Sequence, residues 1–299
     1  MTPSGYKSPV FLATAGVLAI ASSAILIRLA FAEGGRTDTS FVFALAACRI
    51  LLATLLLLPF ARLRQIPKTH LPAVRFAVLS GMILAFHFGA WFASLAYTSV
   101  VISTTLVTTN PIWVALLSLI FLKEFPPAKA WPGIALAILG SFWMSFQDAQ
   151  GLQATELEFL GPGLALMGAF CASCYLLLGQ AAQRRGLSVL QYSTIAYGTA
   201  GLLLALTVSV TGGWPTWTPT LLLIIVAMAL GPQIFGHTSI NGLLRVWRPS
   251  SVATLILLEP VGAGIFAGLF LNEWPSPSVL LGAAVVLGGV LWTIRIQEH

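Results

Sequence analysis

The most restrictive feature of this sequence is a series of long apolar stretches separated by short polar connections. A helix needs about 20 consecutive apolar residues to cross the hydrocarbon core of a bilayer. Dividing the chain at charges and at Gly/Pro clusters predicts ten membrane-spanning helices. Their expected bounds are 10–32, 40–60, 72–96, 100–122, 128–147, 159–181, 189–211, 218–240, 250–271 and 277–295. The sequence therefore predicts an all-α polytopic membrane protein.

The composition excludes a water-soluble globule. Only 8% of the residues are charged and 58% are hydrophobic, whereas a soluble domain contains about 25% charged residues. The net charge of +6 does not indicate a nucleic-acid partner, because the basic residues lie in short loops between apolar stretches and not on one solvated face. The expected surroundings are a lipid bilayer.

The basic residues also predict an orientation, because Lys and Arg accumulate in cytoplasmic loops. One side of the predicted helices collects Lys7, Arg62, Arg64, Lys68, Arg75, Lys123, Lys129, Arg184, Arg185, Arg245, Arg248 and Arg295. The other side holds Arg36 together with Glu33, Asp38, Asp148, Glu156, Glu158 and Glu273. Both termini are therefore expected in the cytoplasm. The short loops are typical of a bacterial inner (cytoplasmic) membrane protein.

The three cysteines, Cys48, Cys171 and Cys174, all lie inside apolar stretches. Small residues in such stretches usually serve helix packing, so we expect neither a disulfide nor a metal site. No Walker phosphate-binding pattern occurs in the sequence. No cofactor is expected, and no ATP-binding loop is present.

An internal repeat appears when the chain is aligned with itself at an offset of 149 residues. The identical pairs include Thr105/Thr254, Leu106/Leu255, Pro111/Pro260, Glu124/Glu273, Pro126/Pro275, Gly133/Gly282, Gly140/Gly289 and Trp143/Trp292. The repeat predicts two halves, residues 1–149 and 150–299. Since five spans per half is an odd number, the second half crosses the membrane in the opposite sense. Inverted repeats of this kind are typical of secondary transporters.

These paired motifs resemble the EamA-like branch of the drug/metabolite transporter (DMT) superfamily. The first copy contains Leu95-Ala96-Tyr97-Thr98-Ser99, Thr109-Asn110-Pro111, Phe121-Leu122-Lys123-Glu124 and Gly133 to Gly140. The second copy contains Leu258-Glu259-Pro260-Val261-Gly262, Phe270-Leu271-Asn272-Glu273 and Gly282 to Gly289. The resemblance implies ten helices in two inverted five-helix halves around a central cavity, with spans five and ten outside it. It also implies a transporter of small organic metabolites, with export of amino-acid-like compounds favoured.

Two prolines at matched positions, Pro111 and Pro260, are the main indication of a transport site. Each removes a backbone donor near the middle of its span and interrupts the helix there. Their neighbours Asn110 and Glu259 are both polar, which favours a site-lining role. The alternative is a purely structural kink whose freed backbone groups are satisfied by neighbouring threonines.

Glu259 is the one carboxylate that the sequence places deep in the membrane, at a cost of about 2.5–3.5 kcal/mol if it is charged and unpaired. Arg49 lies at a similar depth, so we expect an ion pair between the two side chains. This pair either holds the two halves together, or opens and binds an anionic substrate group. A proton carried by Glu259, uniport and exchange with a counter-substrate are the alternatives for energy coupling.

Two further sets of residues are candidates for contact with a substrate. His87 and Trp91 are one helical turn apart on one face and suit a small amphiphilic ligand, although a membrane histidine often only bonds to another helix. Trp113 strengthens this interpretation because it lies in mid-span. Arg28 and His237 are possible gate residues. The structural alternative for Arg28 is a side chain that extends to the membrane surface or pairs with Glu33. The structural alternative for His237 is a packing contact at a helix interface.

The sequence thus favours a secondary transporter that works by alternating access. The alternative from another class is a membrane-embedded enzyme that acts on a lipid or isoprenoid-type substrate. Such an enzyme needs clustered Asp or His residues at one interface. The four histidines are scattered and no Asp-rich motif occurs, so we expect no enzymatic activity.

Overall fold

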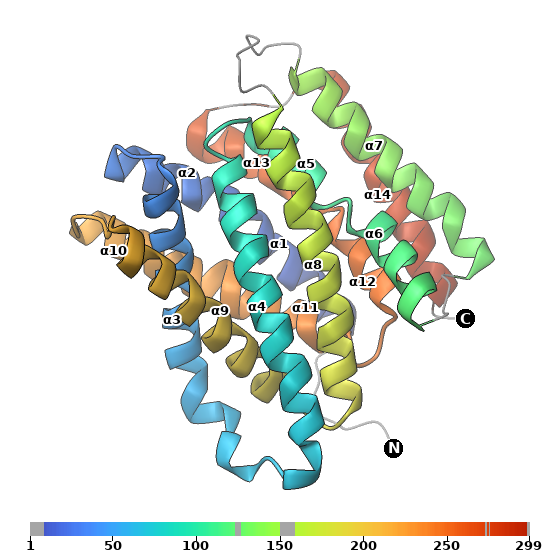
Figure 1. Cartoon of the computed structure of the whole chain (residues 1–299). Helices are drawn as coiled ribbons and strands as arrows, with labels where there is room; N and C mark the ends of the chain where they lie inside the picture. Colours follow the sequence, from blue (N-terminus) through green and yellow to red (C-terminus); the bar gives the residue numbers. More distant parts are fainter. Residues whose placement is uncertain (1–8, 123–126, 150–158, 273, 275, 298–299) are drawn as a thin grey trace.

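The computed structural model describes residues 9–122, 127–149, 159–272, 274 and 276–297. Within these ranges the chain forms helices and short connections, without a strand (Figure 1). Several positions used above lie outside the described residues. They are Lys7, Lys123, Glu124, Pro126, Glu156, Glu158, Glu273, Pro275 and the first residues of the predicted second half.

Eight helical stretches in the described ranges are long and apolar enough to cross a membrane. They are Leu12–Gly34, Thr39–Ala61, Lys68–Ser94, Val100–Ile120, Leu160–Arg184, Val189–Thr211, Pro219–Leu243 and Pro249–Leu271. A shorter apolar stretch covers Pro277–Thr293. The helix α7 (Trp131–Ala149) covers the predicted fifth span. The structure is therefore that of a multi-pass membrane protein.

The first half of the chain contains the helices α1 to α7. Their bounds are α1 Pro9–Ala21, α2 Ser23–Gly34, α3 Thr39–Ala61, α4 Leu71–Ser94, α5 Val100–Val107, α6 Asn110–Leu117 and α7 Trp131–Ala149. The second half contains α8 to α14. Their bounds are α8 Leu160–Arg184, α9 Val189–Thr211, α10 Pro219–Met228, α11 Thr238–Leu243, α12 Pro249–Ile256, α13 Glu259–Leu271 and α14 Pro277–Gln297.

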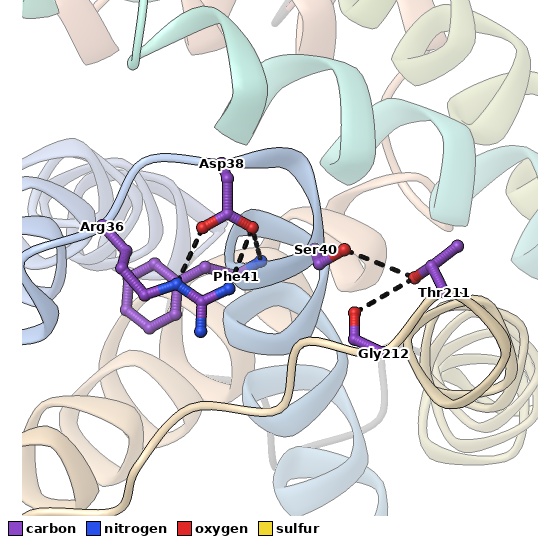
Figure 2. Close-up of polar contacts among 6 residues, drawn as sticks. All are labelled: Arg36, Asp38, Ser40, Phe41, Thr211 and Gly212. Carbon is purple, nitrogen blue, oxygen red and sulfur yellow. Dashed lines mark hydrogen bonds and ion pairs between the residues drawn. The ribbon is translucent and has the colours of Figure 1, made fainter.

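Capping side chains fix where several helices begin. Asp38 accepts a hydrogen bond from the Phe41 backbone nitrogen at 3.2 Å and begins α3. The same carboxylate pairs with the Arg36 guanidinium at 2.8 and 3.0 Å (Figure 2). Ser40, in the first turn of α3, lies 3.3 Å from the Thr211 hydroxyl at the end of α9. Polar groups at this end of the molecule therefore join α3 to α9.

The core lies between helices from the two halves of the chain. Helix α4 packs along α8 and α9, and α3 packs along α9. Small residues permit the close approach: a Cβ on Gly81 of α4 would lie only 2.5 Å from the Ala196 carbonyl of α9. Because apolar side chains gain little by leaving lipid for a neighbouring helix, such close backbone packing is a main source of stability in membranes.

Helices α7 and α14 form a separate pair at one edge of the molecule (Figure 1). A Cβ on Gly289 would lie 2.5 Å from the Gly133 carbonyl, and one on Gly140 would lie 2.8 Å from the Gly282 carbonyl. Gly133, near the start of α7, thus faces Gly289 in the later part of α14, and Gly140 faces Gly282 in its earlier part. The two helices are therefore antiparallel.

Two stretches are interrupted at the same place in the repeat. Helix α5 ends at Val107 and α6 begins at Asn110, while α12 ends at Ile256 and α13 begins at Glu259. Pro111 and Pro260 are tolerated at the start of α6 and α13, where an N–H would have no intrahelical partner. Helix α5 packs on α13, and α6 packs on α12. The two interruptions therefore lie close together.

The predicted span 218–240 is not one regular α-helix. Between α10 and α11 the chain forms a π-helix, η5 (Ala229–His237), which contains Pro232. A π-helix has more residues per turn and changes the direction in which later side chains point, and it is frequent at functional sites. Segment η5 packs on α1 and α3.

Candidate functional site

A small cavity lies between the two halves of the chain, with about 40 Å³ of free space, enough for a few water molecules. An organic solute needs more space than this, so the cavity has to widen to admit one. Both interrupted stretches line it. The first contributes Val107, Thr108 and Asn110, and the second contributes Ile256 and Glu259. The rest of the wall comes from α1, α4, α8, η5 and α11. Neither α7 nor α14 contributes a lining residue, and both expose large apolar side chains such as Leu139 and Leu281.

Two polar side chains at the helix interruptions face this cavity, Asn110 and Glu259. The Asn110 amide nitrogen donates to the carbonyls of Ala169 and Val107 at 3.1 and 3.2 Å in the orientation that satisfies its hydrogen bonds. Glu259 is 5% exposed. Its carboxylate forms neither an ion pair within 4.0 Å nor a hydrogen bond with any residue that the structure describes. Glu259 is therefore an acceptor open to the cavity.

His87 and Trp91 of α4 form an aromatic wall of the cavity. Their rings are stacked, with centroids 6.0 Å apart and planes 13° apart. His87 Nδ1 lies 2.9 Å from the Gly168 carbonyl of α8; because a carbonyl only accepts, Nδ1 carries a proton. The indole nitrogen of Trp91, which is 2% exposed, has no acceptor among the described residues. This wall therefore offers both a flat surface and a free donor.

Arg49 is bound differently from the prediction. Its Nε donates to Gln233 Oε1 at 2.8 Å and its Nη1 donates to Ser23 Oγ at 2.6 Å. The guanidinium also lies over the ring of Phe88, 4.7 Å from the centroid. Arg49 is fully buried and is not a lining residue of the cavity. The predicted ion pair with Glu259 is wrong for this structure, because neutral acceptors from α2 and η5 hold the guanidinium.

The remaining predicted residues lie at different distances from the cavity. His237 lines it, with its ring edge-on to Phe88 at 5.3 Å. Trp113 does not line it; this side chain donates to Thr109 Oγ1 at 3.3 Å. The two prolines are buried and do not line it.

Arg28 is tied to the backbone of a neighbouring segment. Its Nη2 donates to the Thr98 carbonyl at 2.8 Å, which links α2 to the connection between α4 and α5. Glu33 accepts a hydrogen bond from the Thr218 hydroxyl at 2.6 Å. Arg28 is thus placed to join neighbouring segments near one end of the helices.

Sequence reasoning missed a second buried polar network beside the cavity. Asn241 of α11 donates to the Tyr175 hydroxyl at 2.6 Å and to Ser193 Oγ at 3.1 Å. Tyr175 lines the cavity. This network could have been noticed in the sequence, because Asn241 and Tyr175, like Glu259, are polar side chains inside apolar stretches. The same is true of Gln233, the partner of Arg49.

The described residues contain no group of three or more His, Cys, Asp or Glu side chains that could hold a metal ion. The cysteines Cys48, Cys171 and Cys174 are free and partly buried. The polar groups among the described lining residues are one carboxylate, one amide, two imidazoles, one indole, the Tyr175 phenol and the Thr108 hydroxyl, around an apolar space.

Comparison with known proteins decides the family. The model of the EamA-like transporter family matches residues 7–146 and again residues 159–295. The chain belongs to the EamA-like transporter family. As a member of it, the protein is a membrane transporter, and the two successive matches agree with the repeat seen in the sequence.

Curated relatives of this EamA-like protein carry transporter names. The Uncharacterized transporter YdfC of Bacillus subtilis is 27% identical over 251 residues, which covers 83% of this chain and 80% of the relative. The S-adenosylmethionine uptake transporter of Rickettsia bellii is 24% identical over 262 residues, covering 86% and 84%. A solved crystal structure matches with a TM-score of 0.75 and 15% identity over 97% of this chain and 98% of its own. That match shows a shared fold alone.

Proposed function

We propose that this EamA-like protein is a secondary transporter that moves a small, amino-acid-like organic metabolite by alternating access. One observation carries the proposal: the two helix interruptions occupy equivalent positions in the repeat and line one cavity. Interrupted helices at the interface of two repeats are the usual place of substrate binding in secondary transporters. The protein would cycle as the two halves, residues 1–149 and 150–299, exchange their conformations around this cavity.

The packing of α7 and α14 supports an inverted repeat. These helices occupy equivalent places in the two halves, yet they run antiparallel through reciprocal glycine contacts. With α7 and α14 counted as spans, each half has five crossings and the two halves have opposite orientations. Spans five and ten then lie outside the cavity, in contact with lipid, as their exposed leucines suggest.

The remaining spans would form the moving gates. Asn110, His87, Trp91 and Glu259 would contact the substrate, and Arg49 would hold α2, α3 and η5 together beside it. The proposed location is the bacterial inner membrane with both termini in the cytoplasm, which follows from the distribution of Lys and Arg. Energy would come from a gradient of the substrate, of protons or of a counter-substrate.

The first compound to test is S-adenosylmethionine, because a relative is named as its uptake transporter. It combines an amino-acid group with a flat purine ring, which suits a cavity that has one carboxylate and one aromatic wall. Export, the direction that the family resemblance favours, is opposite to the uptake in that relative's name. Vesicles in which one orientation of the protein is blocked at the exposed loops would determine the direction.

The test of the proposal is transport by purified protein in vesicles. Vesicles loaded with S-adenosylmethionine or an amino acid are expected to take up the labelled compound by counterflow, and the variant Glu259→Gln is expected to lose this activity. Vesicles without protein, and vesicles with the surface variant Glu33→Gln, are the controls. Absence of counterflow for every metabolite, together with conversion of a lipid or isoprenoid substrate, would instead support the membrane-enzyme alternative.

The inverted topology has its own test. Single cysteines at Arg36 and at its repeat equivalent Arg185, in a chain whose three native cysteines are replaced by alanine, are labelled from one side of intact cells with a membrane-impermeant reagent. The proposal expects reaction at position 36 from outside and at position 185 only after the cells are opened. Reaction of both positions from the same side would contradict it.

A further inference from the structure

We infer that the central cavity selects ligands that carry an ammonium group, and that Glu259 is the residue that binds this group. The inference rests on the proposed function, since it names the class of substrate for the same cavity. It reverses the sequence-based expectation of an anionic ligand, which depended on Arg49 facing the substrate.

The charge of the cavity wall is the first argument. Among the lining residues that the structure describes there is one carboxylate, Glu259, and neither a Lys nor an Arg. Arg49 is 0% exposed and its guanidinium donates to Gln233 and Ser23. A ligand in the cavity therefore contacts the carboxylate and no basic lining residue, while Arg49 acts on Glu259 electrostatically without an ion pair.

The unsatisfied state of Glu259 is the second argument. A carboxylate inside a membrane is stable only with a partner, and partners are often ligands. Glu259 forms no hydrogen bond or ion pair with any described residue. It stands at the first residue of α13, and the positive end of a helix is equivalent to about half a unit charge. That compensation is partial and Arg49 forms no ion pair with Glu259, so a ligand cation would be the direct partner of the carboxylate.

The aromatic wall is the third argument. An alkylammonium group is attracted to the face of an indole ring, and Trp91 lies on the same cavity as Glu259. Because His87 Nδ1 donates to Gly168, the neutral His87 ring presents Nε2 as a hydrogen-bond acceptor. Acceptors and a π face are the groups that bind an ammonium donor, and a charge-assisted bond to Glu259 would be the strongest of them.

Three probes of one shape and different charge test this inference. They are phenethylamine, 2-phenylethanol and 3-phenylpropionate, which share a phenyl ring on a two-carbon chain and end in an ammonium, a hydroxyl and a carboxylate. Their affinities for the purified full-length protein in detergent are measured by titration calorimetry. Phenethylamine is expected to bind at least about tenfold more tightly than either of the other two.

The variant Glu259→Gln keeps the shape of the side chain and removes its charge. It is expected to lower the affinity for phenethylamine at least about tenfold and to leave that for 2-phenylethanol unchanged. Glu33→Gln is the matched control, because it removes a carboxylate that accepts from Thr218 and lies away from the cavity. If Glu259→Gln does not fold, the comparison of the three probes on the unmodified protein decides alone.

Equal affinity for the three probes, tighter binding of 3-phenylpropionate, or unchanged binding by a folded Glu259→Gln protein would each overturn the inference. Its failure is distinguishable from failure of the proposed function. Transport of an organic anion that does not depend on Glu259 would contradict ammonium selectivity and leave the transporter proposal intact. Ammonium binding without transport of any compound would contradict the transporter proposal and leave ammonium selectivity intact.

Discussion

The indole nitrogen of Trp143 donates a hydrogen bond to the backbone carbonyl of Ser278 at 3.0 Å. The same bond occurs with the helices exchanged, since the indole of Trp292 donates to the Lys129 carbonyl, also at 3.0 Å. Each tryptophan is 149 residues from the other, and so are the two acceptors. When exchanging two packed elements turns each contact into the other, the elements are related by a two-fold axis. The α7–α14 interface therefore carries the symmetry of the repeat in its hydrogen bonds.

A pair of adjacent glycines tests the importance of this interface. A Cβ on Gly289 would meet the Ala137 nitrogen and the Gly133 carbonyl at 2.5 Å, whereas one on Gly288 would meet only Leu136 Cδ2 at 4.0 Å. Gly289→Ala is expected to lower the free energy of unfolding by about 1–3 kcal/mol through overpacking. Gly288→Ala is expected to be neutral, or to stabilise by up to about 1 kcal/mol, because Ala favours helix. Thermal unfolding in detergent measures both, and equal shifts would contradict the close packing.

The hydrogen bond between Arg49 and Gln233 predicts that replacing Gln233 destabilises the protein more than replacing Gln180, another buried glutamine. Gln233→Leu leaves the Arg49 Nε without its acceptor at 2.8 Å, and an unsatisfied bond to a charged group costs about 1.5–3 kcal/mol. Gln180→Leu removes only two long bonds, of 3.4 and 3.5 Å, to backbone carbonyls. We expect the first variant to lose clearly more stability in thermal unfolding. A larger loss in the second would show that Gln233 does not hold Arg49.

The different positions of Trp91 and Trp113 predict that their substitutions affect transport differently. Trp91 lines the cavity, and its indole nitrogen has no acceptor among the described residues. Trp113 lies outside the cavity and bonds to Thr109. Trp91→Phe is expected to raise the KM for a transported compound about tenfold, which corresponds to about 1.4 kcal/mol, whereas Trp113→Phe is expected to change it less than about twofold. Vesicle counterflow gives both values, and equal effects would argue against the aromatic wall as a substrate contact.

The Arg36–Asp38 ion pair predicts a pH dependence of stability (Figure 2). The hydrogen bond from Arg36 lowers the pKa of Asp38 below its usual value. A carboxylate whose pKa is lower in the folded state stabilises the fold above its unfolded pKa, about 3.9, and this contribution is lost as the pH falls through the lower folded value.

The comparison variant for this ion pair is Asp38→Asn, which retains an N-cap side chain and lacks the charge. Its melting temperature is expected to lie below that of the unmodified protein at pH 7, and the difference is expected to close as the pH falls from about 4. Asp38→Ala also removes the cap and is expected to lose about 1 kcal/mol more at pH 7. A difference that does not change with pH would contradict the ion pair.

Much of the architecture could be predicted because it depends on one-dimensional patterns. Long apolar stretches predicted helices, and eight of the described stretches are long and apolar enough to cross a membrane. The interruptions at Asn110 and Glu259 could be anticipated from Pro111 and Pro260, since proline cannot continue the hydrogen bonding of a helix. The motifs indicated the EamA-like family, which the family model confirms.

The partner of Arg49 could not be predicted in the same way. Hydropathy gives the depth of a residue in the membrane, but not the direction in which its side chain leaves the helix. Arg49 and Glu259 were expected at a similar depth, yet Gln233 of the π-helix η5 accepts the hydrogen bond from the guanidinium. The register change in η5 is a local irregularity at Pro232, and an apolar pattern with a period of 3.6 residues does not contain it.

The helix starts at Asn110 and Glu259 have a consequence for solvation. The first turn of any helix has backbone donors without intrahelical acceptors, and hydrocarbon offers them nothing to bond to. A cavity that exposes such groups together with a carboxylate has to be hydrated whenever no solute occupies it. Each solute that enters must displace ordered water, and its affinity is then the difference between two sets of hydrogen bonds. Desolvation of the chamber, as much as the fit of the solute, sets which molecules it can accept.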